Sequence, residues 1–161
     1  MKIAIISDIH NNLVNLEKCL KTPAVMACAT LICCGDVTNL ETLEFLSQNF
    51  KGQIYLIQGN GETFSDKEAR SFSNINYLGK YGVFNLEGLR IGLCHEPEYI
   101  LKLLEEHKNL QLISYGHTHK PWLKTQDGVE LINPGTLGQG FPTSTFAVYD
   151  TIDKELKLEM V

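Results

Sequence analysis

The chain is predicted to adopt an α/β fold with mixed β-sheets, and two patterns in the sequence predict it. Within residues 1–60, three apolar runs rich in β-branched residues alternate with segments whose leucines recur every three or four positions. Strands that alternate with helices form right-handed βαβ units and a parallel sheet. After residue 80, apolar runs instead flank short turn sequences, which predicts antiparallel hairpins.

The N-terminal strands and helices are each expected from a local pattern. The first strand begins at Lys2, and further strands are expected over 30–34 and 53–58. The first helix is expected to begin near Asn11 or Asn12, either of which can cap it, and to stop at Thr22-Pro23. A short apolar helix over 24–29 and an amphipathic helix over 40–50 complete this half of the chain.

The C-terminal half is expected to be richer in hairpins. Residues 62–76 are polar and are expected to form a surface loop with a short helix. The remaining expected elements are a hairpin of 81–86 and 90–94, a helix from Glu98 to about His107, a strand over 110–115, a hairpin of 122–125 and 129–132, and a terminal hairpin of 146–149 and 155–159. Because no internal repeat or linker is visible, we expect one domain over residues 1–161.

The composition is typical of a soluble globular protein, with 43% hydrophobic and 20% charged residues. No apolar run approaches the roughly 20 residues of a membrane helix, and the N-terminus lacks the features of a signal peptide, so a cytoplasmic protein without membrane contact is expected. The net charge is −5 and no basic run is present, which argues against a protein that coats nucleic acid. The five cysteines form no C-x-x-C pair and are expected to be buried, reduced thiols.

Side chains that can bind a metal follow the ends of separate predicted strands, where open α/β sheets usually bind ligands. They are Asp8, His10, Asp36, Asn60, His95, His117 and His119. Seven ligands exceed the roughly four of one zinc site and suit two metals that share a bridging carboxylate. Oxygen and imidazole donors without thiolate favour Mn²⁺, Fe, Zn²⁺ or Ni²⁺. Two such ions about 3.5–4 Å apart can clamp a phosphoryl centre.

The order D-x-H, G-D, G-N, H and G-H-x-H resembles the calcineurin-like metallophosphoesterase superfamily, and in particular its small phosphodiesterase branch. The resemblance covers essentially the whole chain, and its most specific parts are G-H-T-H-K-P at 116–121 and I-N-P-G at 132–135. It implies an αββα sandwich of two mixed β-sheets flanked by helices. The turn at Asn133–Thr136 either closes the sheet or lies near the metals and shapes the pocket.

The resemblance also implies a ligand set and a reaction. One metal would be held by Asp8, His10, Asp36 and His119, and the other by Asp36, Asn60, His95 and His117. Asp36 would bridge two divalent ions, with Mn²⁺ expected first and Ni²⁺, Zn²⁺ or Fe as alternatives. The implied enzyme is a metal-dependent phosphodiesterase that hydrolyses a small phosphodiester. In it a metal-bridging hydroxide attacks phosphorus in line with the leaving group.

Two positions depart from the pattern of this superfamily. Many relatives have a histidine after G-N that can protonate the leaving group, and the small branch commonly has Cys-Asp, whereas this chain has Gly61 and Glu62. Glu62 either donates that proton or is a loop carboxylate that faces water or binds a backbone amide. Glu96 stands where relatives have glycine, and it either narrows the pocket or, as we favour, interacts with the dipole of the following helix. Trp122 and Phe141 are expected to pack in the fold rather than line a cleft.

Two other functions are compatible with the resemblance. One is a non-catalytic metal-binding scaffold that interacts with proteins, as in the retromer-subunit lineage, where a ligand histidine is replaced; here every ligand position is filled. The other is a phosphomonoesterase, against which the missing histidine after Asn60 argues. Exposed sheet edges would also allow a homo-oligomer, which the sequence does not require.

Overall fold

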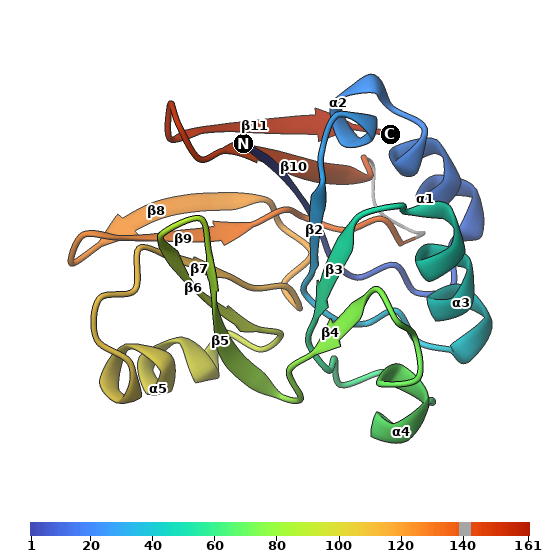
Figure 1. Ribbon diagram of the computed structural model, residues 1–161, viewed down its shortest axis with the longest axis horizontal. Helices are drawn as coiled ribbons and strands as arrows, with labels where there is room; N and C mark the ends of the chain where they lie inside the picture. The colour runs from blue at the N-terminus through green and yellow to red at the C-terminus, as the bar shows by residue number, and fades with distance from the viewer. Residues whose placement is uncertain (139–142) are drawn as a thin grey trace.

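Two β-sheets packed face to face form the centre of the molecule (Figure 1), a computed structural model that describes residues 1–138 and 143–161. Phe141 therefore lies outside the described residues. The six-stranded sheet has the order β11-β10-β1-β2-β3-β4. Its strands are β1 (Lys2–Ile6), β2 (Thr30–Cys33), β3 (Gln53–Leu56), β4 (Ile75–Tyr77), β10 (Thr145–Asp150) and β11 (Glu155–Met160).

The five-stranded sheet has the order β5-β6-β7-β9-β8. Its strands are β5 (Tyr81–Leu86), β6 (Leu89–Cys94), β7 (Leu112–Ser114), β8 (Trp122–Gln126) and β9 (Val129–Asn133). Both sheets are mixed: β1 is parallel to β2 but antiparallel to β10, and β7 is parallel to β9, which is antiparallel to β8. The predicted pair of mixed sheets is confirmed.

Helices cover the two outer faces of this sandwich. They are α1 (Leu13–Leu20), α2 (Pro23–Met26), α3 (Leu40–Asn49), α4 (Asp66–Ala69) and α5 (Glu98–Glu106). Asn12 is the residue that caps α1, because its side chain accepts a hydrogen bond from the amide of Asn15 at 3.1 Å. Helix α2 is shorter than the expected 24–29, since the chain must leave it to enter β2 at Thr30.

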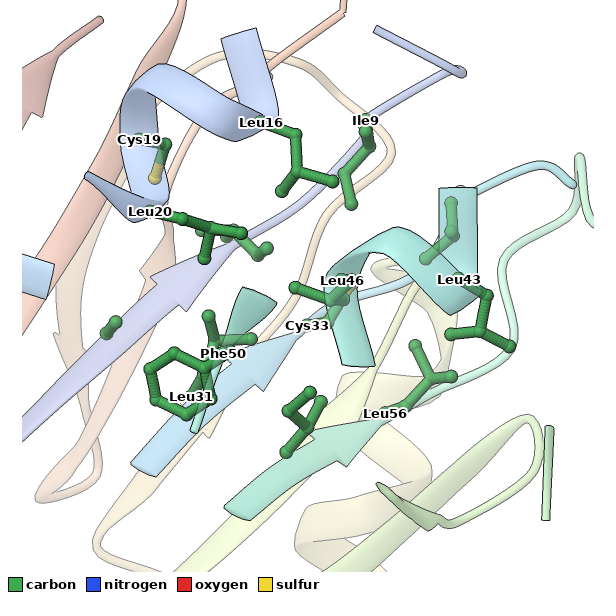
Figure 2. Packing of buried hydrophobic residues seen from close by; sticks show 14 of the residues in the cluster. Ile9, Leu16, Cys19, Leu20, Leu31, Cys33, Leu43, Leu46, Phe50 and Leu56 are labelled. Atoms are coloured by element: carbon green, nitrogen blue, oxygen red, sulfur yellow. The ribbon is translucent and has the colours of Figure 1, made fainter. Parts of the chain in front are cut away.

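Three hydrophobic clusters hold the four layers together. Figure 2 shows the first, in which α1 and α3 pack on the six-stranded sheet through residues such as Leu16, Leu46 and Leu56. The second lies between the sheets, and the third lies between the five-stranded sheet and α5. Cys33 belongs to the first cluster and Cys34 to the second, because neighbours in a strand point to opposite faces. All five cysteines are buried and free, as predicted.

Two expectations from the sequence are wrong. Residues 75–77 form the short strand β4, because Ile75 and Tyr77 turn inward while Asn76 faces solvent; the polar segment before them concealed this alternation. Trp122 is 60% exposed, since it lies on β8 at the edge of its sheet. No helix in the part of the chain that the structure describes is long and apolar enough to cross a membrane.

Candidate metal centre

The candidate ligands are positioned by strand ends from both sheets. Asp8 and His10 follow β1, Asp36 follows β2, and Asn60 follows β3, all in the six-stranded sheet. The five-stranded sheet supplies His95, which follows β6, and His117 and His119, which follow β7. The contacts described next bring all seven side chains to one place, where the carboxyl ends of parallel strands from the two sheets meet.

One side of the centre is built around the carboxylate of Asp8, which is fully buried. Its Oδ1 lies 3.1 Å from Nε2 of His119, 3.8 Å from Nε2 of His10 and 3.9 Å from Nε2 of His95. Nε2 of His10 and Nε2 of His119 are 3.2 Å apart. Several imidazole nitrogens thus converge on one carboxylate oxygen, an arrangement that suits ligands of a shared cation.

The other side is built around Asp36 and Asn60. Oδ2 of Asp36 lies 3.5 Å from Nε2 of His95 and 3.8 Å from Nε2 of His10. Oδ1 of Asn60 lies 3.0 Å from Nε2 of His95 and 2.9 Å from Nδ1 of His117. Asp36 therefore lies between two histidines that the resemblance assigns to different metals.

Two groups of His and carboxylate ligands are close enough to hold an ion each. One is Asp8, His10 and His119, and the other is Asp8, Asp36 and His95. Asp8 belongs to both groups, whereas the resemblance gives the bridging role to Asp36; the two buried carboxylates lie together at the middle of the centre. The remaining candidates, Asn60 and His117, adjoin the second group through His95.

The donor atoms fit a divalent metal. Oδ1 of Asp8 makes no hydrogen bond within residues 1–138 and 143–161, although a buried carboxylate oxygen normally has a partner. Nδ1 of His95 lies 2.7 Å from the carbonyl oxygen of Cys34. Because a carbonyl can only accept, this contact places a proton on Nδ1 and turns Nε2 toward the carboxylates, as in many metal-ligating histidines. All the converging donor atoms are nitrogen or oxygen.

The backbone of the centre is strained. Five candidate ligands have a positive φ although they are not glycine: Asp8 (53°), His10 (47°), Asp36 (52°), His117 (67°) and His119 (58°). Left-handed conformations cost such residues of order 1–3 kcal/mol each and cluster at functional sites. Backbone bonds support them, including the amide of Asp8 to the carbonyl of Gly35 and the amide of His10 to the carbonyl of Asp36, both 3.0 Å.

Burial and charge shift the acidities of the central groups. Burial raises the pKa of Asp8. Burial also acts to raise the pKa of Asp36, but hydrogen bonds from His95 and the Gly61 amide, with the charges of His95 and His10, leave it below its ordinary value. Burial acts to lower the pKa of His95, but Asp36 and Asp8 hold it above the ordinary value. The two carboxylates thus favour the protonated form of this imidazole.

Glu62 binds backbone amides, which is one of the two functions predicted for it. One oxygen accepts from the amides of Val37 and Gly59, both at 3.2 Å, and the other accepts from the amide of Thr38 at 2.6 Å. The side chain therefore ties the loop that carries Asp36 to the loop that carries Asn60. With both oxygens engaged in this way, Glu62 is a positioning residue rather than a free acid.

The Asn-Pro-Gly turn positions the centre, a role that the sequence left open. The hydroxyl of Thr136 donates to the carbonyl of Asp8 at 2.8 Å. The side-chain amide of Asn133 donates to the carbonyl of Gly116 at 2.8 Å, and its oxygen accepts from the amide of Gly135 at 2.9 Å. Sequence reasoning did not assign Asn133 this role, although a buried polar side chain beside a glycine turn is a usable signal.

The sequence matches the calcineurin-like phosphoesterase superfamily domain over residues 1–154. The chain belongs to the calcineurin-like phosphoesterase superfamily. This membership and the converging nitrogen and oxygen donors identify a metal-dependent phosphoesterase.

Individual proteins of known sequence or structure are similar to this chain over nearly its whole length. Phosphodiesterase MJ0936 of Methanocaldococcus jannaschii is 28% identical, over 98% of this chain and 97% of the relative. A structure described as a novel archaeal phosphodiesterase superposes with a TM-score of 0.89 at 24% identity, over 100% of both chains. Vps29 of Entamoeba histolytica, complexed with Zn²⁺, superposes with a TM-score of 0.69 at 19% identity, over 100% of this chain and 98% of Vps29.

Proposed function

We propose that the protein is a phosphodiesterase that hydrolyses a small phosphodiester with two divalent ions. The observation that carries the proposal is the convergence of buried Asp8 and Asp36 with four histidines and Asn60 at one point between the sheets. The phosphodiesterase relative supports diester specificity, and Vps29, a structure of similar fold that is complexed with Zn²⁺, supports metal binding. One ion would be held by Asp8, His10, Asp36 and His119, and the other by Asp36, Asn60, His95 and His117.

The chain's own residues would prepare the site for catalysis. Two bound divalent ions would supply Lewis-acid polarisation of the phosphoryl group and a lowered pKa for the attacking water. Asp8 and Asp36 offset the ionic charge from a buried position, where their attraction for cations is strong. The contacts from Cys34, Glu62 and Thr136 hold the ligand-bearing loops in place, so little reorganisation is needed when substrate binds.

Metal removal tests this function. Protein stripped with a chelator is expected to lose hydrolysis of bis(p-nitrophenyl) phosphate, and Mn²⁺, Ni²⁺ or Zn²⁺ added back is expected to restore it. Metal content measured beside the rate is expected to approach two ions per chain. Two results would contradict the proposal: turnover by protein that is completely free of metal, and no turnover by protein that has two ions bound.

A second prediction concerns the leaving group. Gly61 has no side chain to donate a proton, and both oxygens of Glu62 are occupied by amides. Hydrolysis is therefore expected to slow steeply as the pKa of the leaving alcohol rises. The measurement is kcat/KM over a series of substituted phenyl phosphodiesters. If log kcat/KM does not change with the pKa of the leaving alcohol, another group donates the proton. If the dependence is steep, Gly61→His is expected to make it shallower.

A scaffold function is the second candidate, and the structural similarity to Vps29 is the observation that favours it. Retention of all seven candidate ligands argues for catalysis. The metal experiment separates the two, because a scaffold is expected to bind metal without turnover of any phosphodiester.

A further inference from the structure

A small polar pocket lies beside the candidate metal centre. Its volume is about 220 Å³, and it is lined by Gln58, Gly59, Asn60, Lys80 and Glu96. Asn60 belongs to both places, because its Oδ1 lies 3.0 Å from Nε2 of His95 and 2.9 Å from Nδ1 of His117. The pocket therefore adjoins the centre and can receive one of the two ester substituents of a phosphodiester bound there.

The two charged side chains of the pocket come from different loops. Lys80 lies between β4 and β5, where the amide of Gln58 donates to the carbonyl of Gly79 at 2.7 Å and ties this turn to the loop that carries Asn60. Glu96 lies between β6 and α5, directly after His95. Neither side chain makes a hydrogen bond or ion pair with another described residue, so both are available to a ligand.

Glu96 lies outside α5, whose first residue is Glu98 and whose N-cap position is held by Pro97. The carboxylate is half-buried and lines the pocket. This position favours the pocket role over the interaction with the helix dipole that is expected from the sequence.

The hydrogen-bonding groups that line the pocket favour some ester substituents of the phosphodiester over others. The pocket offers an ammonium donor on Lys80, a carboxylate acceptor on Glu96 and an amide on Gln58 that can do both. Hydroxyl groups also donate and accept, and carboxylates recognise sugar hydroxyls in this way in dinucleotide-binding folds. An apolar group could form a hydrogen bond with neither charged side chain, and a second anion would face Glu96.

The size of the pocket limits the substituent further. Pockets for drug-sized ligands span about 300–1,000 Å³. A pocket of about 220 Å³ therefore fits a small hydroxylated fragment rather than a whole nucleotide.

We propose that this pocket is a subsite for a small hydroxylated alcohol, such as a glycerol or pentose group, esterified to the scissile phosphate. Glu96 accepts hydrogen bonds from its hydroxyls and Lys80 donates to them. The inference rests on the proposed function, because it names one substituent of the same phosphodiester.

A matched pair of substrates tests the subsite. The 2,3-dihydroxypropyl and propyl esters of p-nitrophenyl phosphate share a phosphate and a leaving group and differ only in two hydroxyls. The wild-type protein is expected to prefer the dihydroxypropyl ester by about tenfold in kcat/KM, the value of one good hydrogen bond to a charged group. Glu96→Ala is expected to abolish the preference and Lys80→Ala to reduce it. Glu98→Ala, which removes the same charge from the exposed first turn of α5, is expected to leave it intact.

Three outcomes would overturn the subsite. They are equal rates for the two esters in the wild type, a preference that survives Glu96→Ala, and a stronger preference for the p-nitrophenyl ester of phosphorylcholine that is lost in Glu96→Ala. The last would mean that Glu96 recognises a cation.

A binding measurement separates this inference from the proposed function. Titration calorimetry compares glycerol phosphate with propyl phosphate on the metal-loaded protein. If turnover is absent, tighter binding of glycerol phosphate supports the subsite while the phosphodiesterase proposal fails, and equal binding overturns the subsite as well.

Discussion

Asp36→Ala is expected to abolish metal-dependent phosphodiester hydrolysis while the protein remains folded. Asp36 is 3% exposed, and its Oδ2 lies within 4 Å of Nε2 of both His95 and His10, so its loss removes charge from the middle of the centre. Loss of a residue that only supports a metal ligand costs about 10–100-fold, and loss of a ligand is expected to exceed ~100-fold. The measurements are kcat/KM with bis(p-nitrophenyl) phosphate and the number of metal ions bound per chain.

Two further variants make the result specific. Asp36→Asn keeps an oxygen that can accept from the amide of Gly61, a contact of 2.7 Å in the native protein, but it removes the charge. It is expected to fold like the wild type and to be nearly as inactive as Asp36→Ala. Asp153→Ala removes an exposed aspartate from the turn between β10 and β11 and is expected to keep full activity. Wild-type activity in Asp36→Asn would show that charge at this position is not required.

Gly59→Ala is expected to cost both stability and metal binding. A Cβ at this position would lie 2.1 Å from Oδ1 and 2.2 Å from the backbone nitrogen of Asp36. Because a backbone atom cannot move aside as a flexible side chain can, the two loops must separate. The expected loss is about 3 kcal/mol or more in the free energy of unfolding, the upper end of overpacking effects. Chemical denaturation and metal titration measure the two effects.

Gly61→Ala is the matched control for this steric argument. Its Cβ would lie 3.3 Å from Oδ1 of Asp36, a tight contact that a small side-chain adjustment relieves. The expected change in stability is within about 1 kcal/mol, which is typical of a mild substitution. Equal losses for the two variants would contradict the close approach of Gly59 to the backbone of Asp36.

Much of the candidate site could be predicted because its side chains share one sequence feature, a position just after a strand. Each candidate ligand follows a buried strand, and apolar patterning makes buried strands visible in a sequence. The glycines before Asp36 and Asn60 also have a steric cause. A Cβ on Gly35 would lie 2.8 Å from the backbone nitrogen of Gly59, and a Cβ on Gly59 would lie 2.2 Å from that of Asp36. The order of strand ends therefore indicated which side chains lie together at the candidate centre before any tertiary contact was known.

The rest depended on tertiary contacts that leave no local pattern. The three amides bound by Glu62 belong to residues up to 25 positions away in sequence, so no periodicity identifies its role. The left-handed backbone at Asp8 and Asp36 exists only because neighbouring loops support it. Trp122 is a large aromatic residue and is therefore expected to be buried. It is exposed because it lies on an edge strand.

The candidate ligands come from two sheets, so the packing between the sheets affects the geometry of the centre. Asp8, His10, Asp36 and Asn60 follow strands of one sheet, and His95, His117 and His119 follow strands of the other. The distance between the halves is set by side chains of the layer between the sheets, among them Ile5 and Leu93. Close-packed interiors transmit changes in volume instead of absorbing them. The spacing of the candidate ligands can therefore change through substitutions at buried aliphatic positions, without replacement of any ligand.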